Sequence, residues 1–149
     1  YYEKLKIIRV LSKHAKIFVI SEGRLPKELE EYSTNVNPED IHYLLAHASL
    51  YIGDGATMAT ESALAGTPAI YLGEYMNGSL LDLKDNFGLV FNCITVKEII
   101  QISLKIISKP LNFYDKKVEE IINTKVNITA FLVDYIENFN KSLNISVET

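Results

Sequence analysis

Residue types that suit the binding of an anion occur together near the middle of the chain. A turn with two glycines at 53–55 comes directly before a run of helix formers over 56–65. The first N–H groups of a helix have no partner within the helix, and the helix dipole places positive charge beside them, which suits a phosphate. Glu61 lies four residues after Thr57, hence on the same helix face, where its carboxylate can accept hydrogen bonds from ligand hydroxyls.

The two glycines give this turn room for a ligand. Gly53 and Gly55 can adopt a positive φ, and neither places a Cβ between the backbone and a ligand. Thr57 is expected to be the N-cap of the helix. Gly55, Ala56 and Thr57 are therefore the candidate anion ligands. The alternative is a tight turn with ordinary packing, in which Glu61 is a solvent-exposed residue near the positive end of the helix dipole.

Short apolar runs on both sides of this helix predict strands. Residues 50–52 precede the glycine turn, and residues 68–72 follow Gly66, which ends the helix together with Thr67-Pro68. Residues 16–21 and 89–93 are two further β-rich runs. Strands that alternate with helices predict an α/β fold, a three-layer α/β/α sandwich with a Rossmann-like parallel sheet of about four strands.

Further candidate ligands lie where these strands are expected to end. Open parallel sheets bind ligands beyond the carboxyl ends of their strands. Ser21 is the last residue of the run at 16–21, and Glu22 follows it. Tyr75 lies in the polar segment 73–86, expected to be a loop and a short helix after the strand at 68–72. These residues are candidates for contact with a base or a sugar. A solvated turn and a plain surface loop remain the alternatives.

Helical periodicity accounts for most of the remaining sequence. Asn37 precedes Pro38 and two acids, which predicts a helix start, and Thr95 with Glu98 has the spacing of a capping box. The C-terminal third of the chain is expected to be helical. The amphipathic helices are expected over 1–13, 38–48, 96–108, 112–124 and 128–142.

Composition bounds the class of protein. The chain has 149 residues, of which 48% are hydrophobic and 23% charged, as in a single globular domain. A net charge of −4 without a basic stripe argues against nucleic acid as a partner. Cys93 is the single cysteine, and neither His42 nor His47 has neighbours at metal-ligand spacing, so no metal site and no cofactor are expected. Without a signal peptide layout or an apolar run of roughly 18 residues, we expect no transmembrane segment and a cytoplasmic location.

One string in the chain resembles a known family. DGATMATESALAGTPAI, residues 54–70, resembles the C-terminal-domain motif of GT-B-type glycosyltransferases, which are built from two Rossmann-like domains, and of the related UDP-N-acetylglucosamine 2-epimerases. It looks most like relatives described only as predicted glycosyltransferases of unknown function. The matching positions are Gly55, Thr57, Glu61, Gly66 and Pro68, and a looser similarity covers residues 16–90.

The resemblance implies a function for the anion site. In that family the glycine turn and helix start meet the nucleotide diphosphate, and the glutamate that matches Glu61 binds the ribose hydroxyls. The chain would then be a nucleotide-sugar-binding domain, with a UDP-sugar as ligand and the base near Ser21 and Tyr75. The half of a 2-epimerase, or a non-catalytic module that binds a nucleotide or a protein, remain alternatives.

The resemblance also implies a domain organisation. Residues 1–149 are expected to be one Rossmann-like domain, the C-terminal half of a larger two-domain protein whose N-terminal domain binds the acceptor. Within it we expect an α/β core over 1–94, C-terminal helices over 95–142 and a frayed tail over 143–149. Because the acceptor site and most catalytic groups lie on the other domain in that family, no catalytic base can be named, and this chain is not expected to be active alone.

Overall fold

The computed structural model describes residues 2–21 and 23–144, apart from the side chains of Tyr2, Leu111 and 140–144. The chain forms two compact units, residues 1–119 and residues 120–149. Glu22 and most of the expected tail, residues 145–149, lie outside the described residues.

A parallel sheet is the centre of the first unit. Its strands are β1 (Tyr51–Gly53), β2 (Ala69–Tyr71) and β3 (Val90–Asn92), in the order β1-β2-β3. Every residue of the central strand β2 is buried, as expected for a parallel strand covered on both faces. The α/β fold predicted from the sequence is therefore confirmed, with three of the expected strands in the sheet.

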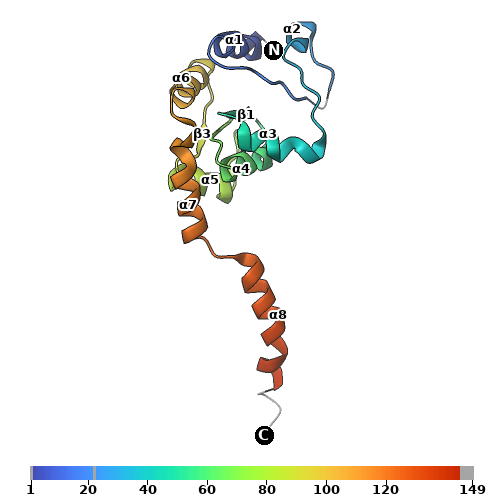
Figure 1. Ribbon diagram of the computed structural model, residues 1–149, viewed down its shortest axis with the longest axis vertical. Helices are drawn as coiled ribbons and strands as arrows, with labels where there is room; N and C mark the ends of the chain where they lie inside the picture. Colours follow the sequence, from blue (N-terminus) through green and yellow to red (C-terminus); the bar gives the residue numbers. More distant parts are fainter. Residues whose placement is uncertain (1, 22, 145–149) are drawn as a thin grey trace. The chain divides into compact units, whose positions relative to one another are not determined.

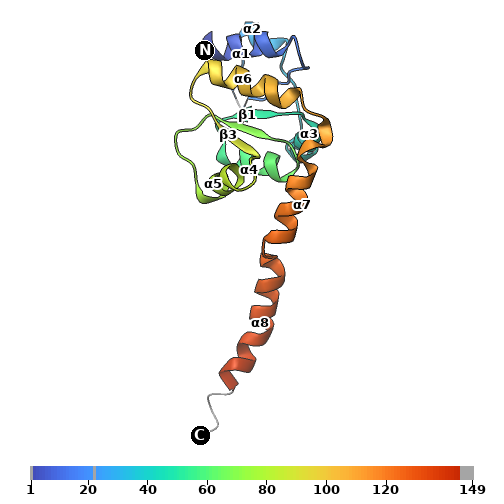
Figure 2. The same cartoon turned by 90° about the vertical axis from the view of Figure 1, so that its left-hand side faces the viewer.

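Helices cover both faces of this sheet. The crossover helices α4 (Ala56–Leu64), between β1 and β2, and α5 (Gly78–Asp85), between β2 and β3, lie on one face. On the other face, α1 (Tyr2–Leu11) packs against α6 (Val96–Ile107) (Figures 1 and 2). This arrangement is the predicted three-layer sandwich.

Small side chains bring α4 close to the sheet. Ala59, Ser62 and Ala63 are completely buried, and their spacing of three and four residues places them on one helix face. The helix ends where the sequence predicts, because Gly66 adopts a φ of 94° that residues with a Cβ rarely adopt. The larger apolar residues that are fully buried lie outside α4. They are Ile70 in β2, Leu80 in α5, Val90 in β3 and Leu89 directly before β3.

The expected strand at 16–21 is not part of the sheet, and this prediction is wrong. Within the described residues the segment makes one isolated parallel bridge, between Val19 and Ser33. Phe18 and Ile20 remain 47% and 49% exposed. The apolar, β-branched composition correctly indicates extended backbone, but a strand also needs a neighbour with a complete row of free backbone groups.

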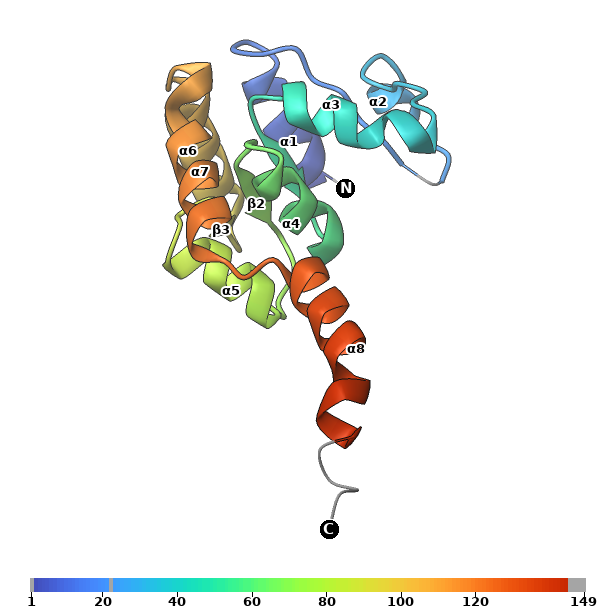
Figure 3. The same cartoon turned by 60° about the horizontal axis from the view of Figure 1, so that its bottom comes forward.

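The other helices agree closely with the periodicity of the sequence. The expected helix at 38–48 begins with one 3₁₀ turn, η1, and continues as α3, which lies beside α4 (Figure 3). A short helix, α2, precedes them, and a 3₁₀ turn, η2, leads into the last two helices. The bounds are α2 Lys27–Glu30, η1 Pro38–Asp40, α3 Ile41–His47, η2 Leu111–Tyr114, α7 Asp115–Thr124 and α8 Ile128–Asn144. None of the helices in the part of the chain that the structure describes combines the length and apolar character that crossing a membrane requires.

Candidate functional site

The start of α4 presents unpaired backbone donors at the carboxyl end of β1. The strand ends at Gly53 and the helix begins at Ala56, with Gly55 as its N-cap. The N–H groups of Ala56, Thr57 and Met58 have no hydrogen-bond acceptor within the described residues. Three such donors at the positive end of a helix can bind an anionic oxygen.

Thr57 is not the N-cap, so this prediction is wrong. The helix starts earlier, because the carbonyl oxygen of Gly55 already accepts the N–H of Ala59 at 3.0 Å, which is the first bond of the helix. Thr57 is an exposed residue inside the first turn. Its hydroxyl therefore has no role in capping, and its backbone N–H is the group that belongs to the site.

The sequence suggests a positive φ at Gly53 and Gly55, but neither residue adopts one. The φ of Gly55 is −79°. Gly53 lacks room for a side chain. The ring of Tyr51 folds along the strand over this residue, and a Cβ there would overlap the phenol, because residues two apart in a strand share one face. Burial raises the pKa of the Tyr51 phenol, the charge of Asp54 raises it further, and the N–H of Gly55 acts in the opposite direction.

Tyr51 is not among the predicted site residues, although its spacing to Gly53 in the sequence indicates this contact. The same spacing recurs on the next strand, where the ring of Tyr71 lies over Gly73. Both tyrosines begin a Tyr-x-Gly-acid sequence; Tyr51 is the first residue of β1 and Tyr71 is the last residue of β2. A glycine two residues after a strand tyrosine leaves room for the ring to lie flat along the strand.

Tyr71 and Asn92 fix the backbone on which the candidate residue Tyr75 lies. The hydroxyl of buried Tyr71 donates to the carbonyl oxygen of Tyr75 at 2.8 Å. The amide of Asn92, at the end of β3, donates to the carbonyl oxygens of Gly73 at 3.0 Å and Tyr71 at 3.1 Å. The side chain of Tyr75 itself is 80% exposed. The loop after β2 is thus held at the carboxyl edge of the sheet, with this aromatic ring in solvent.

Ser21 lies in an exposed turn, where its hydroxyl accepts the N–H of Gly23 at 3.2 Å. No strand of the described sheet ends at Ser21. The geometric reason for placing Ser21 beside the glycine turn is therefore absent. Glu22 lies outside the described residues.

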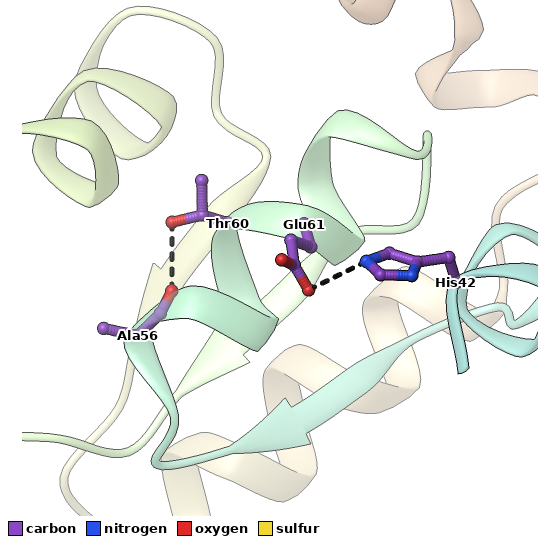
Figure 4. Close-up of polar contacts among 4 residues, drawn as sticks. All are labelled: His42, Ala56, Thr60 and Glu61. Carbon is purple, nitrogen blue, oxygen red and sulfur yellow. Dashed lines mark hydrogen bonds and ion pairs between the residues drawn. The ribbon is translucent and has the colours of Figure 1, made fainter. Parts of the chain in front are cut away.

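Glu61 contacts a histidine that the sequence analysis left without a role. Its Oε2 lies 3.2 Å from Nε2 of His42 on α3 (Figure 4). The side chains are 34% exposed for Glu61 and 66% for His42. Nearby on α4, the hydroxyl of Thr60 donates to the carbonyl oxygen of Ala56 at 3.0 Å. The pair depends on how α3 packs against α4, so spacing within either helix gives no signal for it.

In the comparison with protein families, residues 4–141 match a family described as a protein of unknown function, DUF354. The chain belongs to the DUF354 family. Comparisons with curated proteins and with solved structures gave no match.

A small recess in this DUF354 chain lies away from the first turn of α4. It is lined by residues that precede β1 and β2, among them Ala48, Ser49 and Pro68, and by Tyr114. It is therefore at the amino ends of the strands. Its volume of about 20 Å³ suits a single water molecule. Among the described residues, no group of three His, Cys, Asp or Glu side chains is arranged to hold a metal ion.

Proposed function

We propose that this DUF354 chain is a nucleotide-sugar-binding domain of a glycosyltransferase-like enzyme, with a UDP-sugar as its ligand. The observation that carries the proposal is the set of unaccepted N–H groups on Ala56, Thr57 and Met58, at the carboxyl end of β1. A diphosphate supplies the anionic oxygens that such a helix start attracts. The similarity of residues 54–70 to the GT-B motif supports a nucleotide diphosphate over other anions.

Glu61 supports a nucleotide over a simple phosphate as the ligand. A carboxylate on the second turn of α4 repels an anion bound at the first turn, so a plain phosphate site gains nothing from it. Ribose hydroxyls give the carboxylate hydrogen-bond donors, and each such charge-assisted bond contributes about 1.5–3 kcal/mol. We assign the ribose to Glu61, and the base to the edge of the sheet near Tyr75, with Ser21 kept as a prediction for the same role.

Group transfer itself is assigned to a second domain. This assignment is supported by the resemblance to two-domain glycosyltransferases, in which the acceptor site and most catalytic groups lie on the other domain. In this proposal the described unit 1–119 supplies affinity for the donor substrate. The sugar would then face the cleft between the two domains.

The test begins with a thermal-shift panel of nucleoside diphosphates and their sugars, followed by titration of UDP into wild type and Glu61→Ala. The variant should bind UDP at least roughly tenfold more weakly, which is about 1.4 kcal/mol. A 2′,3′-dideoxy analogue of UDP, which lacks the hydroxyls, should bind both proteins about equally. Unchanged or higher UDP affinity in a folded Glu61→Ala variant would overturn the assignment, because loss of the bonds to the ribose hydroxyls should lower the affinity.

A further inference from the structure

His42 is the side chain that contacts the Glu61 carboxylate. Its Nε2 lies 3.2 Å from Oε2 of Glu61, and Oε1 has no partner within the described residues. Both side chains are partly exposed, and an exposed pair of this kind contributes little to folding stability. What the contact does restrict is the orientation of the carboxylate.

The position of His42 does not depend on this contact. The end of α3 is fixed by Thr67, whose buried hydroxyl donates to the carbonyl oxygen of Leu45 at 2.6 Å and lies 2.9 Å from that of Ala48. The hydroxyl of buried Ser62, next to Glu61 on α4, donates to the carbonyl oxygen of Thr67 at 3.0 Å. Buried hydrogen bonds thus hold both helices, and they hold His42 opposite Glu61.

We propose that His42 is a positioning residue for ribose recognition, which orients Glu61 through Oε2 and leaves Oε1 for the sugar hydroxyls. This inference rests on the proposed function. A glutamate side chain has several rotatable bonds, and fixing them before the ligand arrives removes part of the entropy cost of binding. With its proton on Nε2, the imidazole can also donate to one oxygen of the carboxylate, so the two ribose hydroxyls meet a carboxylate of fixed direction.

The experiment compares UDP with 2′,3′-dideoxy-UDP in variants of the 149-residue chain. The preference for UDP should fall about threefold to fivefold in His42→Ala. His42→Gln should restore most of it, because the glutamine amide can donate to Oε2 from nearly the same place as Nε2. His47→Ala is the matched control: His47 lies on the same helix, but its ring contacts the carbonyl oxygen of Tyr43 at 2.9 Å, and the preference should stay at the wild-type value.

The outcomes separate this inference from the proposed function. If Glu61→Ala abolishes the preference for UDP and His42→Ala keeps it, the ribose assignment stands and the role of His42 is wrong. A loss in His42→Ala that His42→Gln does not recover would also overturn the role of His42 as a hydrogen-bonding partner. If wild type binds both nucleotides equally, the proposed function fails, and the inference fails with it.

Discussion

The hydroxyl of Thr67 donates to the carbonyl oxygen of Leu45 across 2.6 Å, a bond between residues 22 positions apart in the chain. The carbonyl oxygens at the end of a helix have no partner within the helix. A threonine placed just before β2 satisfies this end of α3 from outside. Because Thr67 directly follows Gly66, which ends α4, one short segment fixes α3, α4 and β2 relative to one another.

Replacing this hydroxyl should destabilise the fold. Thr67→Val keeps the shape of the side chain but removes the hydroxyl that donates to the carbonyl oxygen of Leu45. This oxygen still accepts the N–H of Ala48 at 3.1 Å, so we expect a loss of about 0.5–1.5 kcal/mol in the free energy of unfolding. Urea unfolding followed by circular dichroism measures this. Thr34→Val is the control, because the hydroxyl of half-buried Thr34 has no partner within the described residues. Equal stability of the two variants would show that Thr67 does not tie the helices together.

The two strand glycines should differ in their tolerance of a methyl group. A Cβ at Gly73 would overlap the buried ring of Tyr71, and a Cβ at Gly53 would overlap the half-buried ring of Tyr51. Gly73→Ala should cost roughly 1–3 kcal/mol, because the Tyr71 ring is buried and its hydroxyl donates to the carbonyl oxygen of Tyr75. Gly53→Ala should cost less, because the Tyr51 ring can swing toward solvent.

Gly78→Ala is the control for this comparison. Gly78 is the first residue of α5, and a Cβ there meets nothing within 4 Å. This change should leave stability unchanged or raise it by about 0.4–1 kcal/mol, since alanine restricts the unfolded chain. Thermal unfolding of Gly53→Ala, Gly73→Ala and Gly78→Ala ranks the three variants by stability. A Gly73→Ala variant as stable as Gly78→Ala would mean that the ring of Tyr71 is not confined.

Helix starts that depend on side chains a few residues apart could be predicted from the sequence. The capping box of Thr95 and Glu98 is present: Thr95 Oγ1 accepts the N–H of Glu98 at 3.2 Å, and the Glu98 carboxylate accepts the N–H of Thr95 at 3.1 Å. Likewise the cap at Asn77, which accepts the N–H of Leu80 at 2.9 Å, starts α5 within the segment expected to hold a short helix. These bonds join residues three apart, so the types of two residues suffice to predict them.

Most of the wrong or missing predictions concern residues whose contacts lie in distant parts of the sequence. Residues 16–21 have strand composition, but their pairing depends on which segment lies beside them. The role of Thr57 was wrong because capping preference ranks Thr close to Gly, and the alternative start at Gly55 is equally permitted. His42 was left without a role because its contact with Glu61 spans two helices. The position of the free N–H groups at the start of α4 follows from the strand, turn and helix order, but the side chains around them depend on tertiary packing.

The capping box predicts a pH dependence of stability. The N–H of Thr95, the hydroxyl of Thr95 and the N–H of Ile94 hold the pKa of the Glu98 carboxyl below its ordinary value. A carboxyl whose pKa is lower in the folded state stabilises that state above the unfolded pKa, about 4.3, and loses this contribution as pH falls through the lower, folded pKa. Wild type should therefore exceed Glu98→Gln in stability at neutral pH, and the difference should shrink below about pH 4.

Unfolding of both proteins between neutral pH and about pH 3 measures this difference. Glutamine can still accept the N–H of Thr95, so the comparison isolates the charge. In a Thr95→Ala background the hydroxyl no longer contributes, and the pH dependence of the difference should be smaller. A constant difference across the range would show that the charge of Glu98 does not act through the cap.

The last prediction concerns turnover. The proposed function gives this chain the donor nucleotide and assigns activation of the acceptor to another domain. We therefore expect the purified 149-residue chain to bind UDP-N-acetylglucosamine without releasing UDP and without forming the 2-epimer of the sugar. Chromatography of the nucleotide pool after long incubation measures both products.

Glu61→Ala distinguishes turnover by this chain from turnover by a contaminant. A contaminating enzyme would act equally in both preparations, whereas activity at the site on α4 requires the nucleotide to bind there. Product that forms with wild type and disappears with Glu61→Ala would contradict the prediction, and it would place catalytic groups within residues 1–149. The pair of His42 and Glu61, 3.2 Å apart, would then be the first candidate, because an imidazole oriented by a carboxylate is a common general base.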